Sequence, residues 1–264
     1  MSSVGNLLSE YRKSRRLSQL DLGLMADVSS RHISFMENGR ANPSRDMLLR
    51  LADVLDLPLR DSNLLLSAAG FAMTYGNKSL NDEQMLPVKQ ALEIMIDNHN
   101  PYPALVMDSV WNVVMVNEAQ RKLLSFLPLS NLIAGDDAVT SINVLKVLFD
   151  QTGFRPLLKN WDELAGFLLR RLKKQALAFN RSELNSLLDD LLKMNPPENW
   201  QQPPDRQFEG PMVTAKFRLG DQELNVFSTL THFGTALDVG MEELVIESYF
   251  PADEATKNFF KALI

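Results

Sequence analysis

The chain has 264 residues, of which 45% are hydrophobic and 23% charged, and its formal net charge is −6. This composition argues against disorder, and the length suits one large domain or two smaller ones. The absence of cysteine excludes disulfides and thiolate metal centres, and three scattered histidines argue against a histidine-rich metal site, so we predict neither metal nor cofactor.

No apolar run approaches the roughly 18 residues that a transmembrane helix needs. The best candidate, residues 64–73, is short and contains Ser67 and Gly70. The N-terminal residues lack the apolar core of a signal peptide, although Arg15 and Arg16 form a twin-arginine pair. We therefore expect a cytoplasmic protein without a membrane partner.

Charge is divided unevenly along the chain. Residues 1–50 hold eight Lys/Arg and five Asp/Glu, whereas residues 81–264 hold 17 Lys/Arg and 25 Asp/Glu. A locally basic head on an acidic body can still approach a polyanion, because the local field steers the encounter. Charge alone does not separate this interpretation from chance, so the residue pattern has to decide.

The first 60 residues predict short helices separated by tight turns. The first helix spans about residues 4–15, with apolar side chains on one face. The second begins after Ser18, which can form a capping-box pair with Asp21, and ends near residue 26. Asp27 follows at a turn that needs a left-handed backbone, which Asp tolerates better than most residues.

A third helix is predicted between a Ser29 cap and Gly39, and Pro43-Ser44 opens a fourth. Two short helices joined by a four-residue turn describe a helix-turn-helix, whose second helix enters the DNA major groove. Gln19 starts the first helix of that pair, which typically abuts the phosphate backbone. The outward residues of the groove-entering helix are Ser30, Arg31, His32 and Ser34.

Several stretches together resemble the phage-repressor-type (XRE) helix-turn-helix over residues 4–60. They are Leu17-Ser18-Gln19, Val28-Ser29, Ile33-Ser34-Phe35-Met36-Glu37-Asn38-Gly39-Arg40, Pro43-Ser44 and Leu51-Ala52. The resemblance implies base or backbone contacts from Gln19, Ser29, Ser30, Arg31 and Ser34, and sugar-phosphate contacts from Asn38 and Arg40. It also implies a structural ion pair between Arg12 and Glu37.

Two residues depart from the family pattern. Asp27 stands where glycine is usual, and Phe35 stands where a longer polar residue is common. Phe35 would pack either on a thymine methyl or on protein. The alternative to DNA binding is a helical bundle whose polar face is only solvated, but the ordered set of motifs favours DNA binding.

The rest of the chain predicts an α+β domain with an antiparallel sheet and helices on one side. Residues 83–99, 118–127 and 143–194 have helical patterns, and residues 104–117, 211–219, 222–233 and 242–250 have strand patterns. Pro196, Pro197, Pro203 and Pro204 break the chain. We predict a DNA-binding domain over residues 1–73, a polar linker over 74–82 and a second domain over 83–264.

The second domain resembles a PAS domain and, more closely, the ligand-binding domain of MmyB-like transcriptional regulators. The stretches that carry this resemblance are Pro101-Tyr102-Pro103-Ala104-Leu105-Val106, Asn143-Val144-Leu145, Asn160-Trp161, Phe227-Ser228-Thr229, Phe233-Gly234-Thr235 and Glu247-Ser248-Tyr249-Phe250-Pro251-Ala252-Asp253. The resemblance implies a PAS-like sensor for a small, largely apolar molecule, with a fatty-acid-like compound as one candidate.

Methionine and aromatic side chains can line an adaptable apolar pocket, although any single one is more simply explained as core. The candidates are Met107, Trp111, Val113, Met115, Leu145, Phe149, Phe167, Phe217 and Phe227. His232 is a candidate for hydrogen bonding to a ligand head group. Arg155, Arg170 and Arg171 could meet a carboxylate, although the charged run 170–174 is more typical of a solvated helix face.

The sequence contains no G-x-S-x-G elbow, Walker A run or G-x-G-x-x-G, so we do not predict an enzyme. We predict a homodimeric, DNA-binding transcriptional regulator that reads an inverted repeat in double-stranded DNA and responds to a ligand. The alternative is a regulator whose second domain only dimerises or docks a protein. An enclosed apolar cavity would favour the first, and a large exposed apolar patch the second.

Overall fold

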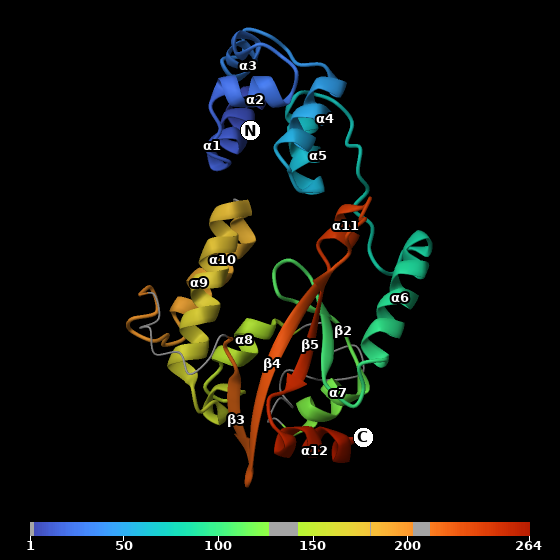
Figure 1. Ribbon diagram of the computed structural model, residues 1–264, viewed down its shortest axis with the longest axis vertical. Coiled ribbons are helices and arrows are strands. Elements are labelled where there is room, and N and C mark those ends of the chain that lie inside the picture. Colours follow the sequence, from blue (N-terminus) through green and yellow to red (C-terminus); the bar gives the residue numbers. More distant parts are fainter. Residues whose placement is uncertain (1–2, 127–141, 180, 203–211) are drawn as a thin grey trace. The chain divides into compact units, whose positions relative to one another are not determined.

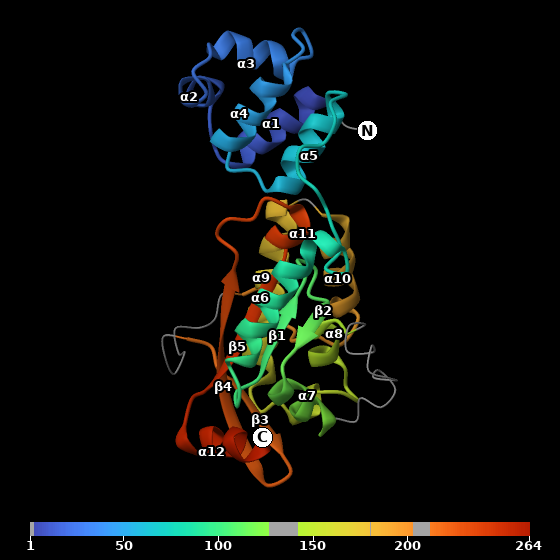
Figure 2. The ribbon, with the colours of Figure 1, turned by 90° about the vertical axis from the view of Figure 1, so that its right-hand side faces the viewer.

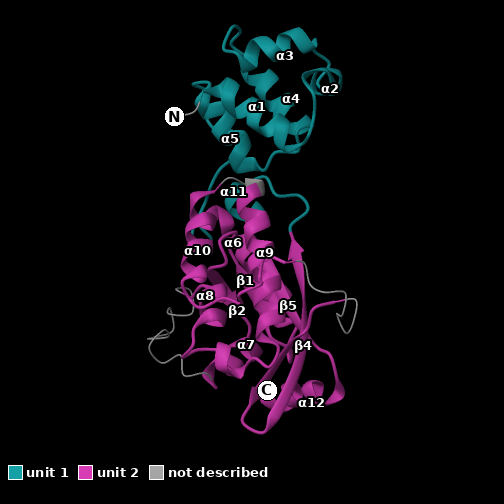
Figure 3. Ribbon diagram, turned by 90° about the vertical axis from the view of Figure 1, so that its left-hand side faces the viewer, with its two compact units in different colours: residues 1–82, 233–242 teal, residues 83–232, 243–264 magenta. Residues whose placement is uncertain are grey.

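The computed structural model describes residues 3–126, 142–179, 181–202 and 212–264 (Figure 1). The chain forms two compact units (Figure 3). Unit 1 comprises residues 1–82 and 233–242, and unit 2 comprises residues 83–232 and 243–264. Pro203, Pro204 and residue 211, where a strand was predicted to start, lie outside the described residues.

Unit 1 is built mainly from five helices: α1 (Val4–Ser14), α2 (Gln19–Met25), α3 (Ser30–Glu37), α4 (Arg45–Val54) and α5 (Leu59–Ala68). The first four each begin after a serine whose hydroxyl accepts a hydrogen bond from the backbone N–H three residues on. Such caps satisfy donors that a helix start leaves unpaired. The apolar faces meet in one core around Leu8, Leu22, Ile33, Leu48 and Leu65.

The turn between α2 and α3 is as tight as the sequence predicts. Asp27 has φ 53°, in the left-handed region. A Cβ at Gly23 would lie 2.7 Å from the carbonyl oxygen of Val28, so a larger residue there would push the two helices apart. This turn therefore fixes where α3 lies relative to α2.

Residues 74–82 pack within unit 1, although their polar composition predicted a linker. Asn63 on α5 supplies the reason, because its amide pairs with their backbone. Its Nδ2 donates to the Tyr75 carbonyl at 2.8 Å, and its Oδ1 accepts from the N–H groups of Thr74 and Tyr75.

Residues 233–242, predicted as part of the second domain, also pack within unit 1, where they include the short helix α11 (Val239–Glu242). The Val239 N–H donates to the Gly76 carbonyl at 2.8 Å. The Leu59 N–H, in the first turn of α5, donates to Glu242 Oε2 at 2.9 Å. The strand predicted from residue 242 therefore starts later, because residues 239–242 are helical.

Unit 2 contains one antiparallel five-stranded sheet in the order β2-β1-β5-β4-β3. The strands are β1 (Ala104–Met107), β2 (Val113–Val116), β3 (Ala215–Leu219), β4 (Gln222–His232) and β5 (Val245–Pro251). The run 104–117 forms two strands because the chain turns through Trp111, whose φ is 69°. The predicted α+β fold with an antiparallel sheet is confirmed.

Helices lie on both faces of this sheet, rather than on the one face expected (Figures 1 and 2). One side carries η1 (Glu83–Met85) and α6 (Leu86–Asp97), and the other carries α8 (Val144–Phe149), η3 (Arg155–Leu157), α9 (Trp161–Phe179) and α10 (Ser182–Leu192). All four residues of β1 are buried, which a strand covered on both faces requires. Helices α7 (Glu118–Ser125) and α12 (Glu254–Leu263) pack together beside the sheet.

No helix among the described residues combines the length and apolar character that crossing a membrane requires.

Candidate functional site

Helix α3 presents its polar face to solvent. Ser29 and Arg31 are exposed, and Ser30, His32 and Ser34 are half-buried. Ile33 and Met36 on the opposite face are buried in the core of unit 1. The predicted DNA-reading residues of this helix therefore share one accessible surface.

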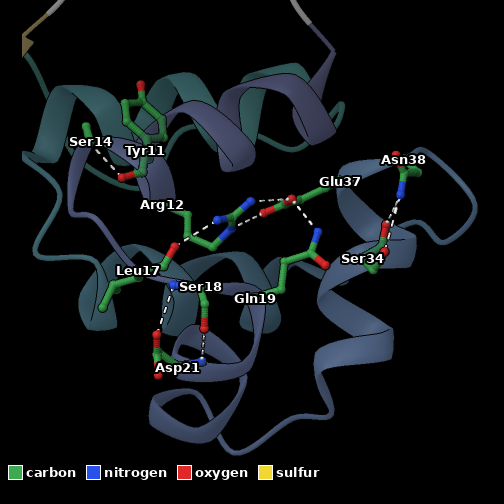
Figure 4. Close-up of polar contacts among 10 residues, drawn as sticks. All are labelled: Tyr11, Arg12, Ser14, Leu17, Ser18, Gln19, Asp21, Ser34, Glu37 and Asn38. Carbon is green, nitrogen blue, oxygen red and sulfur yellow. Dashed lines mark hydrogen bonds and ion pairs between the residues drawn. The ribbon is translucent and has the colours of Figure 1, made fainter.

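An ion pair fastens α1 to the end of α3 (Figure 4). Arg12 Nε donates to Glu37 Oε1 at 2.6 Å, and Arg12 Nη2 donates to Glu37 Oε2 at 2.9 Å. Arg12 Nη1 donates to the Leu17 carbonyl at 2.8 Å. The pair predicted between these side chains is thus present, in the bidentate geometry that arginine and carboxylate favour.

Gln19 joins the same cluster, since its Nε2 donates to Glu37 Oε2 at 2.8 Å (Figure 4). Burial opposes ionisation of Glu37, but the hydrogen bonds from Arg12 and Gln19 outweigh it and hold the pKa of this carboxyl below its ordinary value. The charged carboxylate therefore orients the Gln19 side chain at the start of α2. Orientation before binding reduces the ordering cost of a DNA contact.

Phe35 packs on the protein's own Arg31. The Arg31 guanidinium carbon lies 5.1 Å from the centre of the Phe35 ring, one helical turn away. A cation over an aromatic face is favourable, and the contact narrows the directions that a long exposed side chain samples. Phe35 is thus placed to orient Arg31.

Asn38 and Arg40, the two residues predicted to contact the sugar-phosphate backbone of DNA, follow α3. The amide of Asn38 is engaged within the helix end, donating to the Ser34 carbonyl at 2.8 Å and to Ser34 Oγ at 3.3 Å. Gly39 has φ 69°, which turns the chain out of the helix, and Arg40 is exposed just beyond it. Arg40 is therefore the accessible cation of this turn, whereas the Asn38 side chain mainly closes the helix.

Unit 2 contains an apolar cavity of about 170 Å³, walled by the sheet, α7, α8, α9 and α12. Its apolar lining includes Leu105, Trp111, Val113, Val116, Leu123, Leu124, Val144, Val147, Phe154, Leu164, Phe167, Leu168, Ala215, Phe217, Val226, Phe227 and Phe260. Apolar cavities of about 150 Å³ stay dry and accept benzene-sized molecules, so this one can hold a small apolar ligand.

Five of the predicted pocket residues line this cavity: Trp111, Val113, Phe167, Phe217 and Phe227. Five do not. Met107, Leu145 and Phe149 are buried in solid core, Met115 is half-buried away from the cavity, and His232 is exposed at the end of β4. Strand alternation and aromatic content identify buried positions, but they do not tell which buried positions border a void.

Four polar side chains on the wall were missed: Gln120, Ser228, Glu247 and Tyr249. Glu247 is 8% exposed and accepts a hydrogen bond from Ser228 Oγ at 2.7 Å. Burial raises the pKa of Glu247 against the hydrogen bonds from Ser228 and Tyr249, and it raises the pKa of Tyr249 as well. A sequence signal for Glu247 did exist. It is an acidic residue within an otherwise largely apolar strand, and such a residue is rarely buried without a partner.

The three arginines proposed for a ligand carboxylate do not line the cavity, although Arg171 contacts the lining residue Trp111. Arg155 lies over Trp161, 4.3 Å from the ring centre, and donates to the Met194 carbonyl. Arg170 donates to the Trp200 carbonyl at 2.9 Å, and Arg171 lies over Trp111 at 5.0 Å. None of the described cavity-lining residues is Lys, Arg or His.

Comparisons with known proteins match both units. A model of the MmyB-like transcription regulator ligand binding domain matches residues 88–263, and a helix-turn-helix model matches residues 8–62. The solved PAS domain from Bordetella pertussis BvgS is similar at 15% identity and a TM-score of 0.30, covering 67% of this chain and 94% of that chain. A comparison with curated proteins found no match.

Proposed function

Because the chain belongs to the family of MmyB-like transcription regulators, we propose that it reads a specific operator and that a small apolar ligand changes its operator affinity. Members of this family are DNA-binding transcription regulators with a ligand-binding domain, and this protein is one of them.

DNA reading is supported most directly by Arg31, which is exposed on α3 and lies over the Phe35 ring. An arginine held over a groove can make paired hydrogen bonds to guanine O6 and N7. Two copies of α3 in a homodimer would enter adjacent major grooves about 34 Å apart, on an inverted repeat. Ser30, Ser34 and Gln19 add contacts around Arg31, and Arg40 contacts phosphate.

The cavity supports a ligand role for unit 2, over a role limited to dimerisation or docking. Its wall is mostly apolar and its volume, about 170 Å³, suits a short acyl or alkyl chain. We therefore propose a fatty-acyl-like chain as the apolar part of the ligand.

Chain connectivity supplies a route from ligand to DNA. Phe227 and Ser228 on β4, and Glu247 and Tyr249 on β5, all line the cavity. The segment that joins these two strands, residues 233–242, is part of unit 1 and is tied to α5 through the Leu59–Glu242 hydrogen bond. A ligand that favours one arrangement of β4 and β5 would thereby favour one state of unit 1.

Selection from a random duplex DNA library tests the proposal. We expect the full-length protein to enrich an inverted repeat with half-sites about one turn apart. The Arg31→Ala variant should enrich it weakly and lose preference at one base pair of each half-site. Failure of the wild-type protein to enrich any sequence would contradict DNA reading, whereas enrichment of a single, unrepeated site would contradict only the dimer geometry.

Native mass spectrometry of the purified protein, followed by denaturation, tests the ligand. Release of one apolar molecule per chain would support the sensor role and identify the class. A homogeneous protein without ligand that also binds no added alkyl probe would contradict the sensor role and favour a unit 2 that only dimerises or docks a protein.

A further inference from the structure

Four polar side chains on the cavity wall determine which ligand head group the cavity can hydrogen-bond. Gln120 lies on α7, Ser228 on β4, and Glu247 and Tyr249 on β5, and all four line the cavity. They are the only described lining residues with a side-chain carboxyl, amide or hydroxyl group. These four side chains are therefore the principal hydrogen-bonding groups that the described lining offers to a ligand.

Both hydroxyl protons in this group are already used. Ser228 Oγ donates to Glu247 Oε1 at 2.7 Å, and the Tyr249 hydroxyl also hydrogen-bonds to Glu247. A hydroxyl has one proton to donate, so each of these oxygens offers the cavity only lone pairs. The Glu247 carboxyl accepts from both hydroxyls, so Ser228 and Tyr249 present lone pairs to the cavity.

Gln120 adds an amide whose oxygen has no hydrogen-bond partner among the described residues. Its side chain is 8% exposed, and its Oε1 is buried. Buried acceptors are nearly always paired in native proteins, and a donor supplied from the cavity would satisfy this one.

Charge on the wall also argues against an anionic ligand. No described lining residue carries a positive charge. The guanidinium of Arg171 lies over the Trp111 ring. Its positive charge acts on Glu247, where it lowers the pKa against the larger effect of burial. A ligand carboxylate would lose its hydration in this cavity and meet no lining cation in exchange, which is unfavourable.

We propose that the cavity selects an apolar molecule carrying an uncharged hydrogen-bond donor, such as a hydroxyl or amide N–H, and discriminates against a carboxylate. This inference rests on the proposed function, that the cavity holds a ligand. It refines the fatty-acyl-like chain by assigning the head group: a fatty alcohol or amide, rather than the free acid.

Three eight-carbon probes test the inference on the full-length protein by isothermal titration calorimetry at pH 7. They are 1-octanol, its isomer 1-methoxyheptane and octanoate. The ether has the same atoms as the alcohol but no donor. We expect 1-octanol to bind about tenfold more tightly than the ether, because the ether leaves the buried acceptors unpaired. We expect octanoate to bind most weakly.

The outcomes separate this inference from the proposed function. Equal binding of alcohol and ether, or tightest binding of octanoate, would overturn the donor inference and leave a ligand pocket in place. Absence of binding by all three probes would overturn both.

A variant pair adds a second readout. In Glu247→Gln the amide oxygen can still accept from Ser228, while the new N–H₂ donates toward the cavity. We expect the affinity for octanoate, relative to the affinity for 1-octanol, to rise about tenfold in this variant. The matched control is Glu223→Gln, the same change at an exposed position of β4, which should leave the ratio unchanged. An unchanged ratio in a folded Glu247→Gln protein would contradict the inference; if that variant does not fold, the alcohol-ether comparison decides.

Discussion

Removing either partner of the Arg12–Glu37 pair should strongly destabilise unit 1. The two side chains are only 10% and 5% exposed, and Glu37 accepts two hydrogen bonds from Arg12 and one from Gln19, besides a contact with Ser9. Leaving one member of a buried pair without its partner costs about 3–5 kcal/mol. Because both groups retain slight exposure, we expect Arg12→Met and Glu37→Leu each to cost about 3 kcal/mol.

The double variant should cost much less than the sum of the two. With both charges gone, Met and Leu can pack as apolar residues, and such replacements of buried pairs are often close to neutral. We expect a coupling energy of about 2 kcal/mol or more between the two sites. Urea unfolding followed by circular dichroism at 222 nm measures this. Helices of both units contribute to that signal, so the transition of unit 1 is the one that tryptophan fluorescence does not report.

Tryptophan fluorescence provides an internal control in the same samples, since Trp111, Trp161 and Trp200 all belong to unit 2. The fluorescence transition should stay in place while the helical signal of unit 1 moves. Additive costs, agreeing within about 0.5 kcal/mol, would refute the reasoning, because independent sites add to that accuracy.

Three further predictions concern the two sites. Arg31→Ala should reduce discrimination between the selected operator and one changed at a single base pair by about 1–3 kcal/mol, measured by fluorescence anisotropy; an equal loss on all sequences would assign Arg31 to phosphate instead. Phe35→Leu should weaken operator binding by about 0.5–1 kcal/mol while circular dichroism shows the fold intact, because Arg31 loses its aromatic support. Glu247→Gln should raise the melting temperature at pH 8 and have no such effect near pH 4. Burial raises the pKa of Glu247, so the native state binds more protons than the unfolded state and wild-type stability falls as pH rises from the ordinary Glu value through the raised one. A pH series that shows the same difference at both ends would contradict that assignment.

Local signals in the sequence predicted unit 1 well. Serine caps, the left-handed Asp27 and the Gly39 turn each depend on a few neighbouring residues, so a single sequence reveals them. The Arg12–Glu37 pair was implied by family resemblance, because its partners lie 25 residues apart and no local pattern connects them.

Unit 2 was predictable in class but not in detail. The segment 233–242 lies between two strands of the sheet, and its membership in unit 1 depends on hydrogen bonds to Gly76 and Leu59. The position of the cavity depends on how α8, α9 and α12 pack against the sheet. That packing places Leu145 in the solid core and its neighbour Val144 on the cavity wall. Such placement follows from three-dimensional packing, which hydrophobic pattern alone does not encode.

The dissociation constant of the selected operator, measured with and without saturating 1-octanol, tests most directly whether the cavity controls DNA reading. The matched control is Ala215→Phe, which fills part of the cavity from β3. Our account predicts a change of at least fivefold in the wild-type protein, an equal reciprocal change in octanol affinity when operator is bound, and little change in the variant. An operator affinity that stays the same in wild-type protein with octanol bound would contradict it.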